Sequence, residues 1–150
     1  MVSPEQLQNL WNVSDTVLYP EAVAFIRRLV NQEECSTLPA SQVTGLLNIA
    51  KAATYTELLK FIKHQGERNW PESKKDIATF YTELEKLFTT MKNKRLRDEF
   101  HLVREGLSPR EMSQEVDEVM ALLTRDFIQH LVAENGILAV EKANERAKRR

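Results

Sequence analysis

The chain has 150 residues and a nearly balanced charge, with 21 lysines and arginines against 22 aspartates and glutamates. Its apolar content of 42% and charged content of 29% are typical of a soluble globular domain and argue against disorder. Its longest apolar runs are far shorter than the roughly 20 residues of a membrane span, and the N-terminus lacks a signal-peptide core. The single cysteine, Cys35, excludes a disulfide scaffold and favours a reducing, cytoplasmic location.

Apolar residues recur at spacings of three and four along most of the chain, which predicts an all-α, single-domain antiparallel bundle of about six to seven helices. The helical spacing covers residues 7–11, 22–30, 43–50, 58–65, 77–91, 96–107 and 112–131, with a last amphipathic stretch at 137–148. Only residues 16–19 resemble a strand, and because Pro20 follows at once we predict an extended linker there.

Serine–proline pairs indicate where two of these helices begin. Ser3 and Ser108 each precede a proline, and a glutamine or glutamate follows three residues after each serine. This arrangement predicts a capping box, because the two side chains can satisfy each other's free backbone N–H groups. Within the single domain 1–150 we predict an N-terminal helical extension over 1–36, a core bundle over 37–132 and a basic, fraying C-terminal helix over 137–150.

The balanced total charge conceals segments of opposite sign. Residues 1–40 carry 2 basic and 5 acidic groups, residues 41–110 carry 13 and 9, residues 111–140 carry 1 and 6, and residues 141–150 carry 5 and 2. Electrostatic fields depend on where charges lie, so the basic middle segment is the candidate for binding an anionic partner. A merely solvated charged surface is the alternative interpretation.

Basic residues in the middle segment follow helical spacing. One predicted stripe consists of Lys94, Arg97, His101 and Arg104, with Lys92 and Arg95 beside it. A second consists of Lys60, His64 and Arg68, with Lys63 beside it and Lys51 upstream. Two basic helix faces can track the phosphates of a single strand, and no exposed aromatic ladder accompanies them. The pattern therefore predicts backbone binding with little sequence specificity.

Catalytic and metal chemistry find less support in the sequence. His64, His101 and His130 lie far apart without ligand spacing, and no glycine-rich phosphate loop occurs, so neither a metal nor a cofactor is predicted. Residues 125–130 fit the pattern R-x4-H, which resembles the catalytic motif of dimeric HEPN ribonucleases. That resemblance implies phosphate stabilisation by Arg125 and proton transfer by His130, whereas a partly buried structural histidine is the alternative.

Two segments resemble the small, all-helical subunit of type III CRISPR effector complexes. Residues 41–43 (Ser-Gln-Val) match the family's helix start, and Phe61, Gln65 and Arg68 match its aromatic–Gln–Arg pattern. The resemblance covers about 37–70 clearly and extends loosely to about 132. It implies a non-catalytic subunit of an antiviral defence complex that contacts guide or target RNA through basic helix faces. Thr44 stands where the family has an arginine, so that contact is not expected here.

We therefore predict a non-enzymatic, RNA-proximal subunit or accessory protein. Its predicted partners are RNA and CRISPR effector subunits. No membrane contact is predicted, and self-association stays open. Two alternatives stay open: a metal-independent HEPN-like ribonuclease, and a protein-binding adaptor that uses the acidic helix over 111–140. The candidate RNA-binding residues are Lys51, Lys60, Lys63, Arg68, Lys92, Lys94, Arg95, Arg97 and Arg104.

Overall fold

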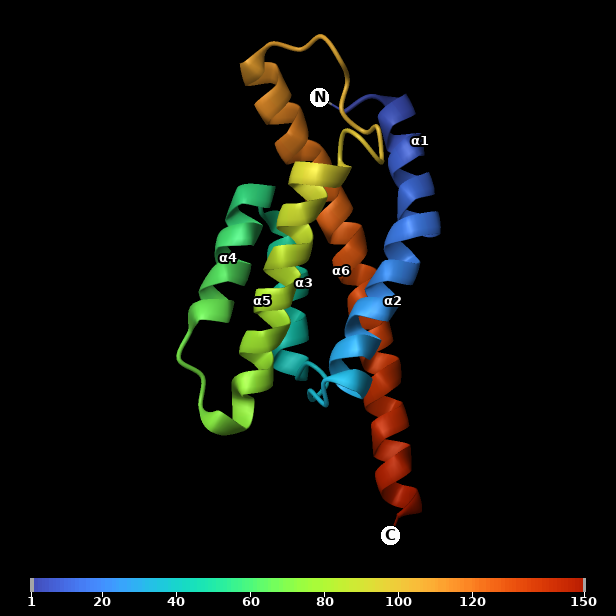
Figure 1. The fold of residues 1–150 in the computed structure, drawn as a ribbon, viewed down its shortest axis with the longest axis vertical. Coiled ribbons are helices and arrows are strands. Elements are labelled where there is room, and N and C mark those ends of the chain that lie inside the picture. The colour runs from blue at the N-terminus through green and yellow to red at the C-terminus, as the bar shows by residue number, and fades with distance from the viewer. Residues whose placement is uncertain (1, 150) are drawn as a thin grey trace.

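The computed structural model describes residues 2–149, which form five continuous helical rods and no strand (Figure 1). The all-α prediction is confirmed, with fewer rods than the predicted six to seven helices. The N-terminal rod joins α1 (Pro4–Val13), a π-helical turn (Ser14–Leu18), α2 (Tyr19–Arg27) and a second π-helical turn (Arg28–Gln32). The other four are α3 (Ala40–Ala52), α4 (Tyr55–Glu67), α5 (Lys75–Thr90) with a π-helical turn (Met91–Arg95), and α6 (Pro109–Lys148).

The N-terminal rod contains the segment predicted as an extended linker. A proline inside a regular helix clashes with the carbonyl four residues earlier, which is why Pro20 suggested a break. A π-helical turn lies immediately before α2, and the Tyr19 N–H bonds to the Ser14 carbonyl five residues back. This wider turn provides the room that Pro20 needs. The extended-linker prediction is therefore wrong, and the helix continues through the proline.

The segment after α5 is predicted to be a helix but is irregular in the structure. Residues 96–107 have helical apolar spacing but form turns and irregular chain. The backbone reverses at His101, whose φ is 52°, and the Leu102 N–H bonds to the Leu96 carbonyl. The apolar residues Leu96, Phe100 and Leu102 are buried by this folded loop. Lys94, Arg97, His101 and Arg104 therefore do not form one helical stripe, and that prediction is wrong.

Both predicted capping boxes are present. Ser3 and Ser108 accept from the backbone N–H three residues later, and the side chains of Gln6 and Glu111 bond back to the serine backbone. The second box begins α6, a helix of 40 residues that joins the predicted helices at 112–131 and 137–148. The predicted break between them is absent, and regular helix extends to Lys148.

The direction of the rods explains how the core is built. The N-terminal rod, α4 and α6 run one way, and α3 and α5 run the other (Figure 1). Helix α2 and α6 are thus parallel neighbours, a departure from a purely antiparallel bundle. The ring of Phe127, which is fully buried, makes edge contacts with Phe25 of α2 and Phe88 of α5. Leu18 and Ile26 of the N-terminal rod belong to the same core, so this rod is a structural part of the bundle.

A buried asparagine fixes the connection between the N-terminal rod and α3 against α6. The Asn135 side-chain oxygen accepts from the Leu38 N–H at 2.8 Å, and its amide donates to the Leu38 carbonyl at 3.1 Å. Both residues are buried, so no solvent replaces these bonds. The Asn135 amide thereby satisfies both polar backbone groups of a loop residue 97 positions away in sequence.

Replacing Asn135 with leucine should strongly destabilise the fold. The Asn135→Leu side chain has a similar size but leaves both buried backbone groups of Leu38 unpaired, at a cost of about 1–3 kcal/mol each. Urea denaturation of this variant should give a clearly lower free energy of unfolding than the parent protein. The exposed Gln129→Leu variant on the same helix should differ from the parent by no more than about 0.5 kcal/mol. Equal stability of both variants would contradict the assigned role of Asn135.

Candidate nucleic-acid interface

Helix α4 presents lysines on the side opposite its buried face. Its N-terminus is capped by the Thr54 hydroxyl, and Tyr55, Leu58 and Ile62 are buried against the bundle. Lys60 and Lys63 lie on the exposed side, three residues apart, so the helical repeat places their ammonium groups on neighbouring turns. The amphipathic sequence of α4 thus orients both cations toward solvent.

The N-terminal end of α4 borders a groove that contains two further cations. Lys92 and Arg97 line it together with Thr56, and the apolar part of its wall includes Met112 and Val116 of α6. The groove has a volume of about 720 Å³. Lys92 leans over α4, with its Nζ 5.6 Å from the centroid of the Tyr55 ring. Thr56, which the sequence interpretation missed, lies four residues before Lys60 on the same helix face, and Asp117 accepts its hydroxyl hydrogen bond at 3.0 Å.

We call the four cations Arg97, Lys92, Lys60 and Lys63 the basic strip. All four are exposed, and within residues 2–149 none of them forms an ion pair. Glu67 lies on the same side of α4 one turn beyond Lys63 and limits the strip at that end. The basic strip therefore runs from the groove along roughly the first two turns of α4.

Arg95, another predicted RNA-binding residue, is held inside the fold. Its two terminal nitrogens each bond to the Glu21 carboxylate at 2.7 Å, and its Nε bonds to Glu99. Its guanidinium lies 4.7 Å from the centroid of the Phe100 ring, and only 19% of the side chain is exposed. The hydrogen bonds to Glu21, followed by those to Glu99, raise the pKa of Arg95 above its ordinary value. Arg95 thus anchors the irregular segment to α2.

Arg104 is paired in a similar way. Its Nε lies 2.6 Å from the Glu115 carboxylate, and its backbone N–H donates to the same carboxylate at 2.8 Å. Burial acts to raise the pKa of Glu115, which is 2% exposed, but the Arg104 backbone and guanidinium together lower it below its ordinary value. This pair fastens the irregular segment to the first turns of α6, so the charge of Arg104 already has a carboxylate partner.

Arg68 lies at the far end of α4, where the residues of the family pattern pack locally. Its guanidinium lies 4.5 Å from the centroid of the Trp70 ring. The Trp70 indole N–H donates to the Gln65 carbonyl at 2.7 Å, and the Phe61 ring meets Tyr81 edge-on at 6.0 Å. These contacts hold the turn between α4 and α5 in place. Arg68 remains exposed, about 18 Å along the helix axis from Thr56.

The other two predicted lysines are exposed but lie off the basic strip. Lys51 is in the last turn of α3, where its carbonyl accepts from Arg125 at 3.1 Å, and Lys94 lies in the π-helical turn after α5. His101 and Arg104 line a second hollow beside the groove, together with the acidic Asp98 and Glu105. Carboxylates thus lie beside the cations of that hollow and offset part of their charge.

The residues of the R-x4-H pattern contact different elements. Arg125 donates to the Ala50 and Lys51 carbonyls at 3.3 and 3.1 Å. These carbonyls lie in the last turn of α3, where the helix itself provides no N–H partner for them. The His130 Nε2 lies 3.0 Å from the Ser14 hydroxyl, and its ring meets Tyr19 edge-on at 5.2 Å. Both side chains therefore have structural partners, as the alternative interpretation of His130 expects.

Several acidic side chains of the helical segment 111–140 are bound within the fold and do not form a free acidic surface. Glu134 is buried and lies 2.6 Å from Arg27 of α2, and Glu115 pairs with Arg104. Asp117 accepts from Thr56 across the groove, and Glu111 forms part of the capping box. At least four carboxylates of this segment thus bind other groups of the chain, which reduces the charge available for a docking adaptor.

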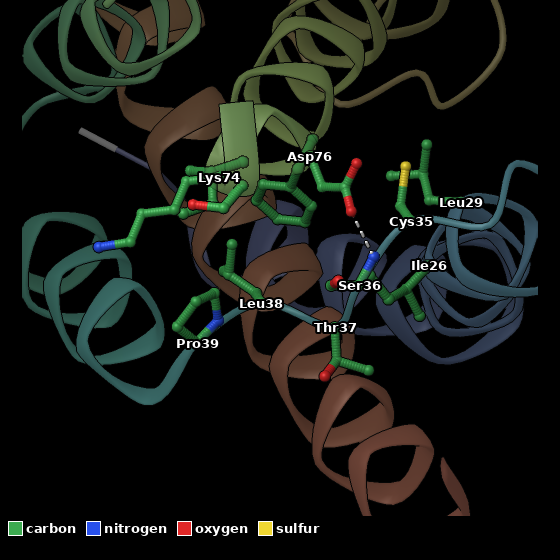
Figure 2. Close-up of a pocket in the computed structure, with 12 residues that line it drawn as sticks. Ile26, Leu29, Cys35, Ser36, Thr37, Leu38, Pro39, Lys74 and Asp76 are labelled. Carbon is green, nitrogen blue, oxygen red and sulfur yellow. Dashed lines mark hydrogen bonds between the residues drawn. The ribbon is translucent and has the colours of Figure 1, made fainter. Parts of the chain in front are cut away.

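A small cavity of about 190 Å³ lies between the end of the N-terminal rod, the loop before α3 and the start of α5 (Figure 2). Its walls are largely apolar, and Asp76 accepts from the Ser36 N–H at 2.8 Å at its edge. Cys35 borders it, and burial, followed by the charges of Asp76 and Glu33, raises the pKa of its thiol. A protonated thiol is a poor nucleophile, so these contacts do not activate Cys35.

Within residues 2–149, no group of three or more histidine, cysteine, aspartate or glutamate side chains is close enough to hold a metal ion. None of the helices in this range has the length and apolar character to cross a membrane. The comparisons with known proteins give no match to a family model, to a curated protein or to a solved structure.

The Glu115 carboxylate should make the stability depend on pH. Because its pKa is lower in the folded protein than its ordinary value, its contribution is present at neutral pH and is lost as the pH falls through the lowered value. Free energies of unfolding from urea titrations should therefore fall less steeply between pH 7 and about pH 3 for Glu115→Gln than for the parent. Arg104→Met should also flatten this profile, and an unchanged slope in both variants would contradict the pairing.

Proposed function

We propose that this protein is a non-catalytic RNA-binding subunit or accessory protein of a type III CRISPR interference complex, acting in the cytoplasm. It binds the RNA backbone through the basic strip, with neither a metal nor an organic cofactor. The observation that carries the proposal is that Arg97, Lys92, Lys60 and Lys63 are exposed along one groove and helix face, without ion pairs to any residue in 2–149. Arg95 and Arg104 lie at the same end of the molecule as the groove, but they are paired with carboxylates of the chain.

The arrangement suits phosphates better than bases. The exposed large apolar side chains of residues 2–149 are Trp11, Tyr19, Ile137 and Val140, and none of them lies on the basic strip. Recognition of single-stranded bases requires aromatic surfaces for stacking, whereas cations alone bind the backbone. The groove between Lys92 and Arg97 can accept one phosphate, and the two lysines of α4 continue the path. Binding should therefore depend strongly on salt and weakly on sequence.

The resemblance over residues 37–70 supports placement in a type III complex. In the folded chain this segment covers α3 and α4, and α4 is the helix that contributes Lys60 and Lys63. A subunit that stacks along an RNA-containing backbone needs a basic face toward the RNA and other faces toward protein. The exposed Arg68 lies where the strip would continue along the RNA, beyond Glu67.

The proposal predicts a specific salt dependence. Binding of the chain to a fluorescein-labelled oligouridine, measured by fluorescence anisotropy at several potassium chloride concentrations, should give a slope of log K against log salt of about −3 for four phosphate contacts. The double variant Lys60→Glu/Lys63→Glu should weaken binding at least about tenfold and reduce the slope to about −1.5, because two contacts are removed.

The matched control reverses two lysines on another helix. Lys75→Glu/Lys86→Glu changes the net charge by the same amount, but these lysines pair with Glu72 and Glu83 and lie on α5. This control should retain nearly the parent affinity and salt slope. An equal loss of RNA affinity in both double variants would mean that only the net charge matters, which would contradict the role of the basic strip. Binding that does not depend on salt would contradict a phosphate interface.

A further inference from the structure

The groove that contains Lys92 and Arg97 also contains a carboxylate. Asp117 of α6 is half-buried and lines the groove together with both cations. Within residues 2–149, no lysine, arginine or histidine forms an ion pair with it. A carboxylate repels a phosphate bound nearby, because like charges repel each other. Phosphate binding alone therefore does not explain why Asp117 lies in this groove.

Asp117 lies close to Lys92, because both are near the ring of Tyr55. The Lys92 Nζ is 5.6 Å from the centroid of that ring. Burial, followed by the charges of Asp117 and Glu85, raises the pKa of Tyr55 to about 12. A nucleotide bound at this end of the groove can therefore contact the ammonium group with its phosphate and the carboxylate with its sugar.

The Asp117 carboxylate has unused capacity to accept hydrogen bonds. An ionised carboxylate is an acceptor only, with about four lone-pair positions on its two oxygens. Thr56 donates to Oδ1 at 3.0 Å, and among residues 2–149 it is the one donor to this carboxylate. The bond to Thr56 holds the carboxylate in place and leaves Oδ2 for a donor of the ligand.

The chemistry of a nucleic-acid backbone identifies that donor. Phosphate and sugar-ring oxygens only accept hydrogen bonds, whereas the 2′-hydroxyl of ribose can also donate one. Carboxylates bind ribose hydroxyls in the same way in dinucleotide-binding domains. The backbone of DNA lacks this hydroxyl and has no donor to offer. An acceptor beside a phosphate-binding cation is thus suited to RNA and unsuited to DNA.

We infer that Asp117 accepts a hydrogen bond from the 2′-hydroxyl of the nucleotide whose phosphate lies at Lys92 and Arg97, and so selects RNA over DNA. The inference rests on the proposed phosphate-binding function of the basic strip. With ribose, the hydrogen bond offsets the repulsion between the carboxylate and the phosphates. With deoxyribose, Asp117 faces the backbone without a donor, and the repulsion remains. Thr56 is a positioning residue in this arrangement.

Three fluorescein-labelled oligomers of equal length test the inference with the parent protein: oligouridine, oligodeoxyuridine and 2′-fluoro oligouridine. The fluorinated sugar keeps the pucker of ribose but has no 2′ donor, so it separates the hydrogen bond from the shape of the sugar. Fluorescence anisotropy should show that oligouridine binds at least about fivefold more tightly than either of the other two. The salt slopes should be equal, because all three oligomers make the same phosphate contacts.

A variant assigns the selectivity to one side chain. Asp117→Ala should reduce the preference for oligouridine over oligodeoxyuridine to less than about twofold, because the hydrogen bond and the repulsion are both removed. The matched control is Asp126→Ala, which removes a half-buried aspartate of the same helix outside the groove. This control should keep the full preference, and circular dichroism should show the parent fold in both variants.

The possible failures are distinguishable. Equal, salt-dependent binding of all three oligomers would overturn the role of the 2′-hydroxyl but leave the phosphate-binding proposal intact. If 2′-fluoro oligouridine bound as tightly as oligouridine, sugar shape would explain the selectivity and the hydrogen bond to Asp117 would be excluded. A preference that persists in Asp117→Ala would contradict the assignment to this residue. Absence of binding to every oligomer would contradict the proposed function itself, and the inference with it.

Discussion

Burial of one face of α6 is the constraint on which the rest of the structure depends. Phe127 packs between α2 and α5, and Asn135 binds both backbone groups of Leu38 in the loop before α3. These contacts set the parallel course of α6 beside the N-terminal rod. They also determine what remains exposed: the first turns of α6 form one wall of the groove, and its last turns project beyond the bundle. The candidate RNA interface therefore lies at the N-terminal end of α6, away from the end that projects beyond the bundle (Figure 1).

Ion pairing distinguishes two sets of basic residues at one end of the bundle. Arg95 and Arg104 bind Glu21, Glu99 and Glu115, and through these pairs they fold the irregular segment 96–108 over the end of the bundle. The basic strip has no such partners within the described chain and faces solvent. The sequence does not distinguish a cation that pairs within the fold from an exposed cation that can bind an anionic partner. The distinction depends on where the carboxylates lie in the folded structure.

Several parts of the fold could be predicted because the governing interactions are local. The capping boxes at Ser3 and Ser108 depend on residues three positions apart, and α4 follows from its own apolar spacing. The predictions are wrong where contacts between residues distant in sequence determine the local backbone conformation. Pro20 is tolerated because a π-helical turn precedes it, and residues 96–107 depart from helical geometry because Arg95 ties their start to α2 and Arg104 ties their end to α6. For the site, the lysines of α4 could be found from spacing, but the groove joining them to Arg97 could not.

Lysine footprinting of the RNA complex tests the central claim most directly. Acetylation of the protein with and without bound oligouridine, read by mass spectrometry, reports the accessibility of each lysine in one experiment. The account predicts that RNA protects Lys60, Lys63 and Lys92, whereas Lys75 and Lys86 on α5 react equally in both states. Protection confined to α5, or equal acetylation of all five lysines with and without RNA at saturating concentration, would contradict it.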